Sequence, residues 1–255
     1  MKNFAQISSF EFETASRTHQ GHVRKFNEDS IFTNPNVGIW LVADGMGGHN
    51  DGNVASSMIA EAVSAFGEAD KTPNLVHDFQ LQIYSVNRRL LAISNGDNAL
   101  LVGSTVVALI IADDTFSCLW AGDSRCYLIR AGSISQVSHD HTEVQELVDR
   151  GAISPQEAKT WPRRNVITRA VGADDGLQLE TVSGIVRHGD CFILCSDGLT
   201  GHVSDAEILE TVRWSRSDEA CNRLVEMALD RGGKDNVSVI VVHASSRDKT
   251  TIVQR

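Results

Sequence analysis

Long apolar runs are missing from this chain of 255 residues. No run approaches the length of about 18 residues at which a segment becomes a candidate membrane span. Residues 1–18 also lack the apolar stretch of a secretory signal peptide. We therefore expect a cytoplasmic protein with no membrane span, whose 42% of hydrophobic residues can form one large core.

Cysteines are few and follow no disulfide or metal-binding pattern. The five cysteines are an odd number, and no two of them form a Cys-x-x-Cys pair. Cys118, Cys191 and Cys195 lie inside apolar runs, which predicts buried structural thiols. A phosphatase with a cysteine nucleophile needs Cys, five residues and Arg, whereas Cys118 and Arg125 are separated by six residues. The spacing therefore argues against covalent cysteine catalysis.

Basic residues are also scarce, with 23 Lys and Arg against 33 Asp and Glu and a formal charge of −10. Nucleic acids are bound through clustered Lys and Arg, so this balance argues against a nucleic-acid partner. The glycine-rich stretch 45–52 lacks the Lys-Ser/Thr of a P-loop, and no Asp-x-Asp-x-Thr nucleophile motif occurs. The excess acids are therefore either spread over the surface or gathered to hold cations.

Four short β-like runs each adjoin an aspartate. An acid beside a strand end can be held by the sheet while its carboxylate faces a shared cleft, and a neighbouring glycine lets the backbone approach closely. One Asp-Gly pair can equally be an ordinary turn, but four such acids favour a cleft lined by carboxylates. The runs and their acids are 38–43 before Asp44, 115–120 before Asp123, 191–195 before Asp197, and 237–242 after Asp235.

Helical patterns lie between these strands and predict an α+β fold. Residues 104–112 and 115–120 are β-like and only two residues apart, so they must pair as an antiparallel hairpin. We expect antiparallel sheets covered by helices in a single domain over 1–255, with a small helical insert at about 143–165 and a frayed tail at about 246–255. The insert has a capping box at Ser154. The other expected helices, with capping signals at Thr72 and Ser204, are 53–66, 73–94, 204–213 and 217–231.

Six motifs follow one another along the chain. They are Arg24–Asp29 (RKFNED), Ala43–His49 (ADGMGGH), Gly103–Thr105 (GST), Ala121–Arg125 (AGDSR), Ser196–Gly198 (SDG) and Gly233–Asn236 (GKDN). Together they resemble the motif set of the bacterial PPM/PP2C family of metal-dependent serine/threonine protein phosphatases. The resemblance covers the chain from about Ser16 to Val242. Any one motif is weak, whereas six in the same order are highly specific.

This resemblance implies a β-sandwich of two antiparallel sheets with helices on both outer faces (α-β-β-α) and a centre of two Mn²⁺ or Mg²⁺ ions at one end. Such enzymes hydrolyse phosphoserine and phosphothreonine in proteins with a water bridging the two ions. Arg24 matches the arginine that binds the substrate phosphate, and Asp123 matches the ligand of a third, weaker ion. The residues that match ligands of the two main ions are Asp44 as the bridging acid, Asp197, Asp235 and the carbonyl oxygen of Gly45. Glu28 and Asp29 match acids beside the second ion, which often act through water.

The chemistry of these residue types agrees with the resemblance. Carboxylate, carbonyl and water oxygens are the ligands that Mg²⁺ and Mn²⁺ prefer, whereas a zinc site would show Cys or His at ligand spacing. His139 and His141 lack such a partner motif, so we interpret both as structural. Two cations about 3.5–4 Å apart lower the pKa of a bridging water. The planar guanidinium of Arg24 can donate two parallel hydrogen bonds to a phosphate.

One departure from the family concerns proton donation to the leaving group. Some members have His at the position of Met46, and that His is assigned there as general acid. Methionine has no proton to donate, so four alternatives stay open: a water on a cation, His49, another group, or a reaction that needs little leaving-group protonation. His49 can equally be an ordinary surface histidine.

Substrates and partners follow from the resemblance alone. It implies a phosphorylated protein substrate and a cognate serine/threonine kinase that the enzyme opposes, and we expect a monomer. The stretches 119–125 and 164–172 are similar to members that accompany type VI secretion systems. The alternative is a catalytically dead relative that binds phosphoproteins as a regulatory module. Such a module should lack a core residue, and this chain retains Arg24, Asp44, Asp197 and Asp235.

Overall fold

Two β-sheets make up the centre of the computed structural model, which describes residues 9–47, 51–67, 74–96 and 102–247. The first sheet contains β1 (Phe10–His19), β11 (Val237–Ser246), β10 (Cys191–Cys195), β7 (Arg125–Arg130) and β8 (Ser133–Gln136), in this spatial order. The second contains β2 (Asp29–Asn34), β3 (Ile39–Met46), β5 (Val106–Ala112), β6 (Thr115–Ala121) and β9 (Glu180–Ile185), with β4 (Gly103–Ser104) paired to β3. All these pairings are antiparallel.

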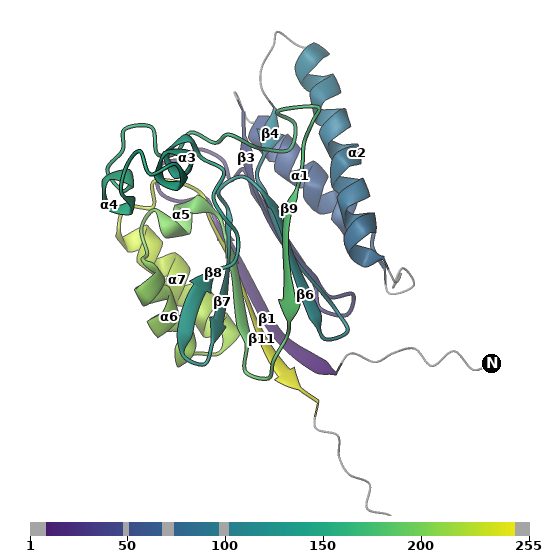
Figure 1. Cartoon of the computed structure of the whole chain (residues 1–255), viewed down its shortest axis with the longest axis vertical. Helices are drawn as coiled ribbons and strands as arrows, with labels where there is room; N and C mark the ends of the chain where they lie inside the picture. Colours follow the sequence, from purple (N-terminus) through teal and green to yellow (C-terminus); the bar gives the residue numbers. More distant parts are fainter. Residues whose placement is uncertain (1–8, 48–50, 68–73, 97–101, 248–255) are drawn as a thin grey trace, which may run out of the picture.

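Helices cover both outer faces of the two sheets (Figure 1). The second sheet is covered by α1 (Asp51–Ser64) and α2 (Leu75–Gly96), and the first by α6 (Asp205–Arg213) and α7 (Ser217–Asp230). Three short helices gather near one end of the sandwich, at the upper left of the view: α3 (Glu143–Asp149), α4 (Pro155–Ala158) and α5 (Asp197–Thr200).

Alternation along the central strands explains this layering. In β3, Trp40 and Val42 belong to the apolar core between the sheets, whereas Ile39 and Leu41 pack in the core under α1 and α2. Successive side chains of a strand point to opposite faces, so a strand buried on both faces must be apolar throughout. β10 alternates in the same way between the central core and the core under α6 and α7. The expected α-β-β-α sandwich is confirmed.

Two predicted strand boundaries were wrong, and one residue explains both. β3 does not end before Asp44 but continues to Met46, and the expected strand 104–112 is interrupted at Thr105. The Thr105 N–H donates to the Asp44 carbonyl oxygen at 2.8 Å, and the Thr105 hydroxyl accepts from the Asp44 N–H at 3.0 Å. Thr105 therefore holds the backbone of Asp44 from both sides, which interrupts the regular strand between β4 and β5.

The helical insert lies between β8 and β9, and we call residues 143–165 the flap. Its α4 begins with a capping box between Ser154 and Glu157, as predicted, and a second capping box begins α6 at Ser204. Thr72 and residues 248–255 lie outside the described residues, while Ser246, expected in the tail, is the last residue of β11. Among the helices that the structure describes, none combines the length and apolar character needed to span a bilayer.

Candidate metal centre and phosphate site

The predicted acids meet at the end of the sandwich near α5. Asp29 opens β2 and lies opposite Asp44 in the register of β2 and β3. Asp197 is the first residue of α5, directly after β10, and Asp235 precedes β11. The charges of Asp29, Asp197 and Asp235 each raise the pKa of Asp44, so the four carboxylates are neighbours in space. The structure therefore brings together acids that are up to about 200 residues apart in the chain.

Asp29 is held by two serine hydroxyls at the junction of the sheets. Its Oδ2 accepts from Ser196 Oγ at 2.8 Å and from Ser238 Oγ at 2.6 Å. The residue is only 6% exposed, and its second oxygen, Oδ1, is buried without a hydrogen-bond partner among the described residues. One face of this carboxylate is therefore fixed, and the other is available to a cation.

Glu28 and Gly45 are joined through the backbone. The Gly45 N–H donates to the Glu28 carbonyl oxygen at 3.1 Å. A Cβ at position 45 would collide with the carbonyl oxygens of Gly52 and Glu28, so only glycine fits at this position. A Cβ at Gly52, the second residue of α1, would lie 2.8 Å from Glu28 Oε1. The two glycines therefore make room for the Glu28 carboxylate against the start of α1.

Asn236 connects these acids to the loop that carries Arg24, a role that sequence reasoning did not assign. Its Oδ1 accepts from the Glu28 N–H at 2.8 Å, and its Nδ2 donates to the carbonyl oxygens of Gln20 at 2.8 Å and Phe26 at 2.9 Å. The only sequence signal was its place in the last of the six motifs. The Asn236 side chain is buried, so its hydrogen bonds to this loop are protected from water.

Arg24 lies beside the acids and keeps part of its guanidinium exposed. Its Nη2 donates to Asp235 Oδ2 at 2.6 Å, and its side chain is 51% exposed. Hydrogen bonding to Asp235 raises the pKa of the guanidinium, which is therefore charged at every relevant pH. A half-exposed arginine next to the acid cluster can meet an incoming phosphate while its charge offsets that of the acids.

Burial and mutual repulsion raise the pKa of every buried acid in the cluster. Burial raises the pKa of Asp29 to about 7. Burial, followed by the charge of Asp235, raises the pKa of Asp197 to about 6. Burial together with Asp29 and Asp197 raises the pKa of Asp44 well above its usual value. The cluster therefore holds more negative charge than its surroundings stabilise, which is the electrostatic signature of a cation site.

The residues fit divalent cations by their donor chemistry. Three buried carboxylate oxygens have no hydrogen-bond partner among the described residues: Glu28 Oε1, Asp29 Oδ1 and Asp197 Oδ1. Buried polar atoms are normally paired, so such oxygens indicate a ligand that protein groups do not replace. Within the described part of the chain, no three acidic, His or Cys side chains form a closed ligand set by themselves. The fit rests on the unpaired oxygens and the repulsion among the acids, and an all-oxygen donor set suits Mg²⁺ or Mn²⁺.

Asp123 lies in the turn from β6 to β7 and is 7% exposed. Burial, followed by the charges of Asp197 and Asp140, raises its pKa to about 8. Asp123 and Asp197 both line a cavity of about 880 Å³ bordered by the flap and by residues 200–207 of α5, α6 and their connection. Asp123 thus adjoins the main cluster and shares this cavity with Asp197.

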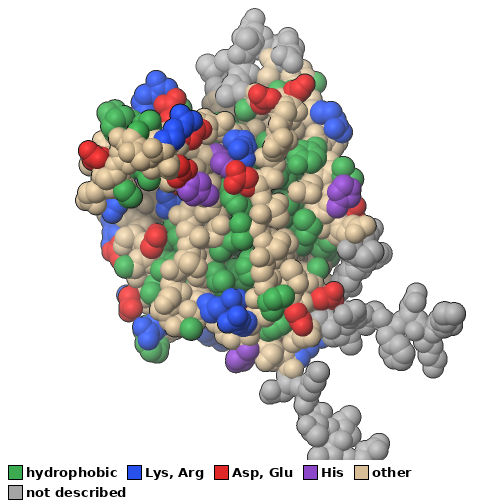
Figure 2. Space-filling view, in the orientation of Figure 1, with side chains coloured by type: hydrophobic (Ala, Val, Ile, Leu, Met, Phe, Trp, Pro, Cys, Tyr) green, Lys and Arg blue, Asp and Glu red, His purple; other side chains and the backbone are tan. Residues whose placement is uncertain are grey.

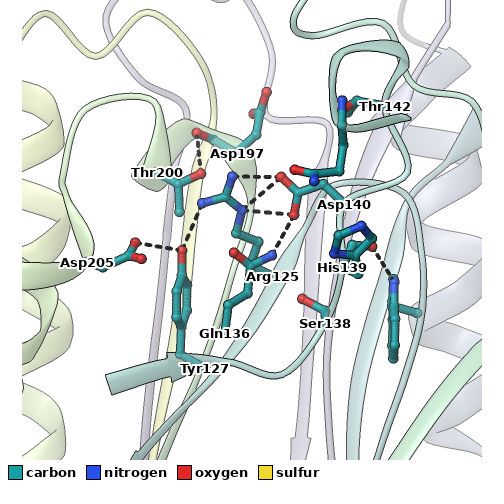
Figure 3. A network of polar contacts seen from close by, with 12 residues as sticks. Arg125, Tyr127, Gln136, Ser138, His139, Asp140, Thr142, Asp197, Thr200 and Asp205 are labelled. Carbon is teal, nitrogen blue, oxygen red and sulfur yellow. Dashed lines mark hydrogen bonds and ion pairs between the residues drawn. The ribbon is translucent and has the colours of Figure 1, made fainter. Parts of the chain in front are cut away.

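A buried polar network forms part of this cavity (Figure 3). Arg125 donates through Nη2 to Asp140 Oδ2 at 2.6 Å, and through Nη1 to the Tyr127 hydroxyl at 2.9 Å. The Tyr127 hydroxyl donates in turn to Asp205 Oδ1 at 3.0 Å. The guanidinium lies between Asp140 and Tyr127 with Asp197 close by, as the close-up shows. Sequence reasoning placed Arg125 in a motif but missed this network, because its members come from three separate segments.

The outer surface of the flap carries charges of both signs, seen at the upper left of Figure 2. Several are paired within the flap or its base: Arg150 with Glu146 at 3.1 Å, and Arg163 with Glu143 at 2.7 Å. Mixed, self-paired charge differs from the continuous basic surface that nucleic acids require. His49, the alternative proton donor, lies outside the described residues, and Met46 is the last residue of β3.

The five cysteines are buried and free, as expected for structural thiols. Three of them, Cys118, Cys191 and Cys195, lie on central strands of the two sheets. Burial raises the pKa of Cys195, which keeps its thiol in the unreactive protonated form at neutral pH. Thiol chemistry therefore has no part in this site.

Known proteins are similar to this chain in sequence and fold. The model of the protein phosphatase 2C family matches residues 17–236. The serine/threonine protein phosphatase PstP of Mycobacterium tuberculosis is 36% identical over 235 residues, which cover 92% of this chain and 45% of PstP. The chain thus spans about half the length of this curated relative.

Two solved structures superpose over nearly the whole chain. PppA, described as a key regulatory component of the type VI secretion system in Pseudomonas aeruginosa, has a TM-score of 0.83 and 38% identity, covering 91% of this chain and 97% of PppA. The PstP catalytic domain in complex with two manganese ions has a TM-score of 0.84 and 34% identity, covering 93% of this chain and 100% of that domain. On sequence and on structure, this chain belongs to the protein phosphatase 2C family.

Proposed function

We propose that this protein hydrolyses phosphoserine and phosphothreonine in proteins, using two Mn²⁺ or Mg²⁺ ions. The observation that carries the proposal is the set of buried, unpaired carboxylate oxygens of Glu28, Asp29 and Asp197 beside the half-exposed Arg24. Cations at this place would supply a hydroxide nucleophile at neutral pH and positive charge for the phosphoryl oxygens. Family membership and the manganese ions in the PstP domain support the same reaction.

The residues of the site would have separate roles in binding the cations and the phosphate. Asp44, Asp197 and Asp235, with the carbonyl oxygen of Gly45, would hold the two ions, and Glu28 and Asp29 would hold the second ion directly or through water. The serine hydroxyls on Asp29 fix the direction in which its free oxygen points. Arg24 would bind and orient the phosphate. Its exposed guanidinium can exchange its hydrogen bond to Asp235 for a hydrogen bond to a phosphate oxygen.

Kinetics with a phosphothreonine peptide test this function directly. The wild-type chain is expected to release phosphate, whereas Arg24→Ala should raise KM about tenfold or more with kcat changed far less, because Arg24 binds ground-state and transition-state phosphate alike. Arg88→Ala, on α2, is a matched control. Peptide binding without phosphate release would favour the catalytically dead regulatory module. An unchanged KM with a greatly reduced kcat would show that Arg24 acts only on the transition state.

Asp123 and the flap are proposed to serve protein substrates in particular. Asp123 would hold a third, weaker ion, and a water on such an ion would supply the leaving group with the proton that the methionine at position 46 lacks. The flap borders the cavity next to Asp197 and can contact a polypeptide beyond its phosphate. His49, which lies outside the described residues, is the alternative proton donor.

Substitution of Asp123 by Asn should therefore affect two substrates unequally. We expect kcat/KM for a phosphothreonine peptide to fall at least about tenfold more than kcat/KM for p-nitrophenyl phosphate, whose leaving group needs no proton. Shortening the flap loop between α3 and α4 should shift the same ratio in the same direction. The measurement is made at saturating Mn²⁺ in each variant. Equal losses on both substrates would place Asp123 in the core machinery and reduce the flap to a scaffold.

The relatives also support a proposal about the cellular role. PppA is described as a regulator of type VI secretion, and two stretches of this chain, 119–125 and 164–172, resemble members of that group. We therefore propose that the protein acts in the cytoplasm as a monomer, opposing a serine/threonine kinase of a secretion system. Phosphoproteomics of a deletion strain, with restoration by the wild-type chain, tests this role independently of the chemistry.

A further inference from the structure

His141 occupies a position that its interpretation as a structural histidine does not explain. It is 7% exposed and lies just before the flap, where its ring stacks on Trp120 with centroids 6.1 Å apart. Its backbone N–H donates to the Gly122 carbonyl oxygen at 3.0 Å, and its Nδ1 accepts from the Gly122 N–H at 3.1 Å. Both backbone polar groups of Gly122, the residue before Asp123, are therefore bonded to His141.

The hydrogen bond from Gly122 determines the form of the ring. A backbone N–H can only donate, so Nδ1 of His141 must be an unprotonated acceptor. The neutral ring then carries its proton on Nε2, which lies 3.1 Å from Glu180 Oε1, off the direction of a good hydrogen bond. Glu180 is also paired with Arg169 at 2.9 Å. The tautomer of His141 therefore depends on its contact with Gly122 and on the acid at its other edge.

Gly122 needs this support because its backbone conformation is restricted. Its φ of +114° is rarely adopted by other residues, and a Cβ at this position would lie 2.6 Å from side-chain atoms of Thr105. The hydroxyl of Thr105 contacts Ser124 at 2.7 Å, and Thr105 also holds the backbone of Asp44. The turn that presents Asp123 is thus fixed by His141 on one side and by Thr105, a neighbour of the main acids, on the other.

His141 also contacts the segment that follows the flap. Its carbonyl oxygen accepts from the Thr168 N–H at 2.9 Å, and the next residue, Thr142, caps α3 and forms a bridge with Ile167. The segment that leads into the flap and the segment that leads out of it therefore pair at His141 and Thr142. A shift of the flap base would move His141 and, through Gly122, the carboxylate of Asp123.

We infer that His141 is a positioning residue that holds Asp123, through the backbone of Gly122, in the place where it binds the labile cation. This inference rests on the proposed role of Asp123 in the third cation site. Outer-shell partners of metal ligands typically contribute about 10- to 100-fold in metal affinity. The inference predicts that the acceptor at Nδ1, and not the bulk of the ring, carries this contribution.

Two substitutions at position 141 separate the acceptor from the ring. His141→Asn keeps an oxygen where Nδ1 lies, and His141→Gln keeps a donor where Nε2 lies but loses the acceptor facing Gly122. Both remove the ring stacked on Trp120, so a purely structural role should make them equivalent. His139→Asn is the matched control, since His139 is exposed and pairs with Asp149 at the surface of the flap. Asp123→Asn tests the cation site itself.

Calorimetric titration of the cation-free proteins with Mn²⁺ is the main measurement, with thermal unfolding recorded in chelator. We expect His141→Gln to weaken the last Mn²⁺ to bind about tenfold or more, while His141→Asn retains most of the wild-type affinity. His141→Gln should also lower kcat for the phosphothreonine peptide more than it raises KM. Equal Mn²⁺ affinities in the two variants, or a loss in His139→Asn of the same size, would overturn the inference.

Asp123→Asn distinguishes failure of this inference from failure of the proposed function. If Asp123→Asn leaves every Mn²⁺ affinity unchanged, the third site is wrong, and the inference about His141 fails with it. If Asp123→Asn removes one site while His141→Gln does not weaken it, only the inference about His141 fails. Should the variants not fold, ¹⁵N-histidine NMR of the wild-type protein decides. A protonated Nδ1 at His141, or no response of that nitrogen when Mg²⁺ fills the last site, would contradict it.

Discussion

Replacing Asp44 with asparagine is expected to lower kcat/KM by about a thousandfold or more for any phosphate ester, because Asp44 would bind both cations of the proposed centre. The residue lies inside β3, opposite Asp29, and its backbone is held by Thr105. Asparagine preserves the shape of the side chain and the strand, so the loss should come from charge and coordination alone. Initial rates at saturating Mn²⁺ measure it, and the exposed Asp175→Asn serves as control.

The same substitution should raise stability when cations are removed. Burial and neighbouring acids raise the pKa of Asp44, which means that its charge is unfavourable in the folded protein without a cation. A neutral amide removes that cost, so Asp44→Asn should melt at a higher temperature than wild type in chelator and respond less to added Mn²⁺. A variant that lost both activity and stability would indicate a structural role, and one that kept near-normal activity would remove Asp44 from the centre.

The acids of the site were predictable because each lies in a local pattern. Asp197 follows the apolar run 191–195 and Asp235 precedes the run 237–242, and both runs are strands of the first sheet. Because the two strands are neighbours in the sheet, Asp197 and Asp235 lie close together at the same end of it. The same reasoning predicted the hairpin of β5 and β6 and the capping boxes at Ser154 and Ser204. Local signals therefore sufficed wherever neighbouring residues decide the geometry.

Contacts between distant segments could not be predicted in this way. The hydroxyls on Asp29 belong to Ser196 and Ser238, which are 167 and 209 residues away in sequence. Serine is common in loops and turns, so neither residue has a local signal for binding an acid. Thr105 resembled a strand residue and was assigned to one, although it holds Asp44 instead. Such partners become visible only when the strand order is known.

Strand β1 was absent from the predicted strands for a related reason. After Phe12 its residues are mostly small or polar, so residues 10–19 lack the apolar content of a typical strand. Its ten residues pair with all ten of β11, and β11 has the apolar pattern that β1 lacks. The stability of β1 therefore comes from its neighbour and from α7, which packs on both strands.

Removal of divalent cations should abolish turnover of every substrate and restore it on addition of Mn²⁺ or Mg²⁺. The reason is that the acid cluster offers cations the oxygen atoms of carboxylates that repel one another, and a cation-activated water would be the nucleophile. The measurement is phosphate release after exhaustive chelation, followed by titration of each metal ion. Full turnover in metal-stripped protein with excess chelator would contradict the two-cation mechanism.

Cation removal should also make stability depend on pH in a defined direction. The folded-state pKa values of Asp197, Asp29 and Asp123, at about 6, 7 and 8, lie above the usual value of an unfolded aspartate, about 3.9. The folded chain therefore binds more protons than the unfolded chain between these values, and the free energy of unfolding falls as pH rises from about 4 to 8. Each pKa unit corresponds to about 1.4 kcal/mol, so the decrease should be large enough to measure by denaturant titration.

Mn²⁺ binds the ionised carboxylates and should offset the decrease, so the stabilisation by Mn²⁺ should grow with pH over the same range. Stability that rises with pH in chelator, or that responds equally to Mn²⁺ at pH 5 and pH 8, would show that these acids do not form the cation site.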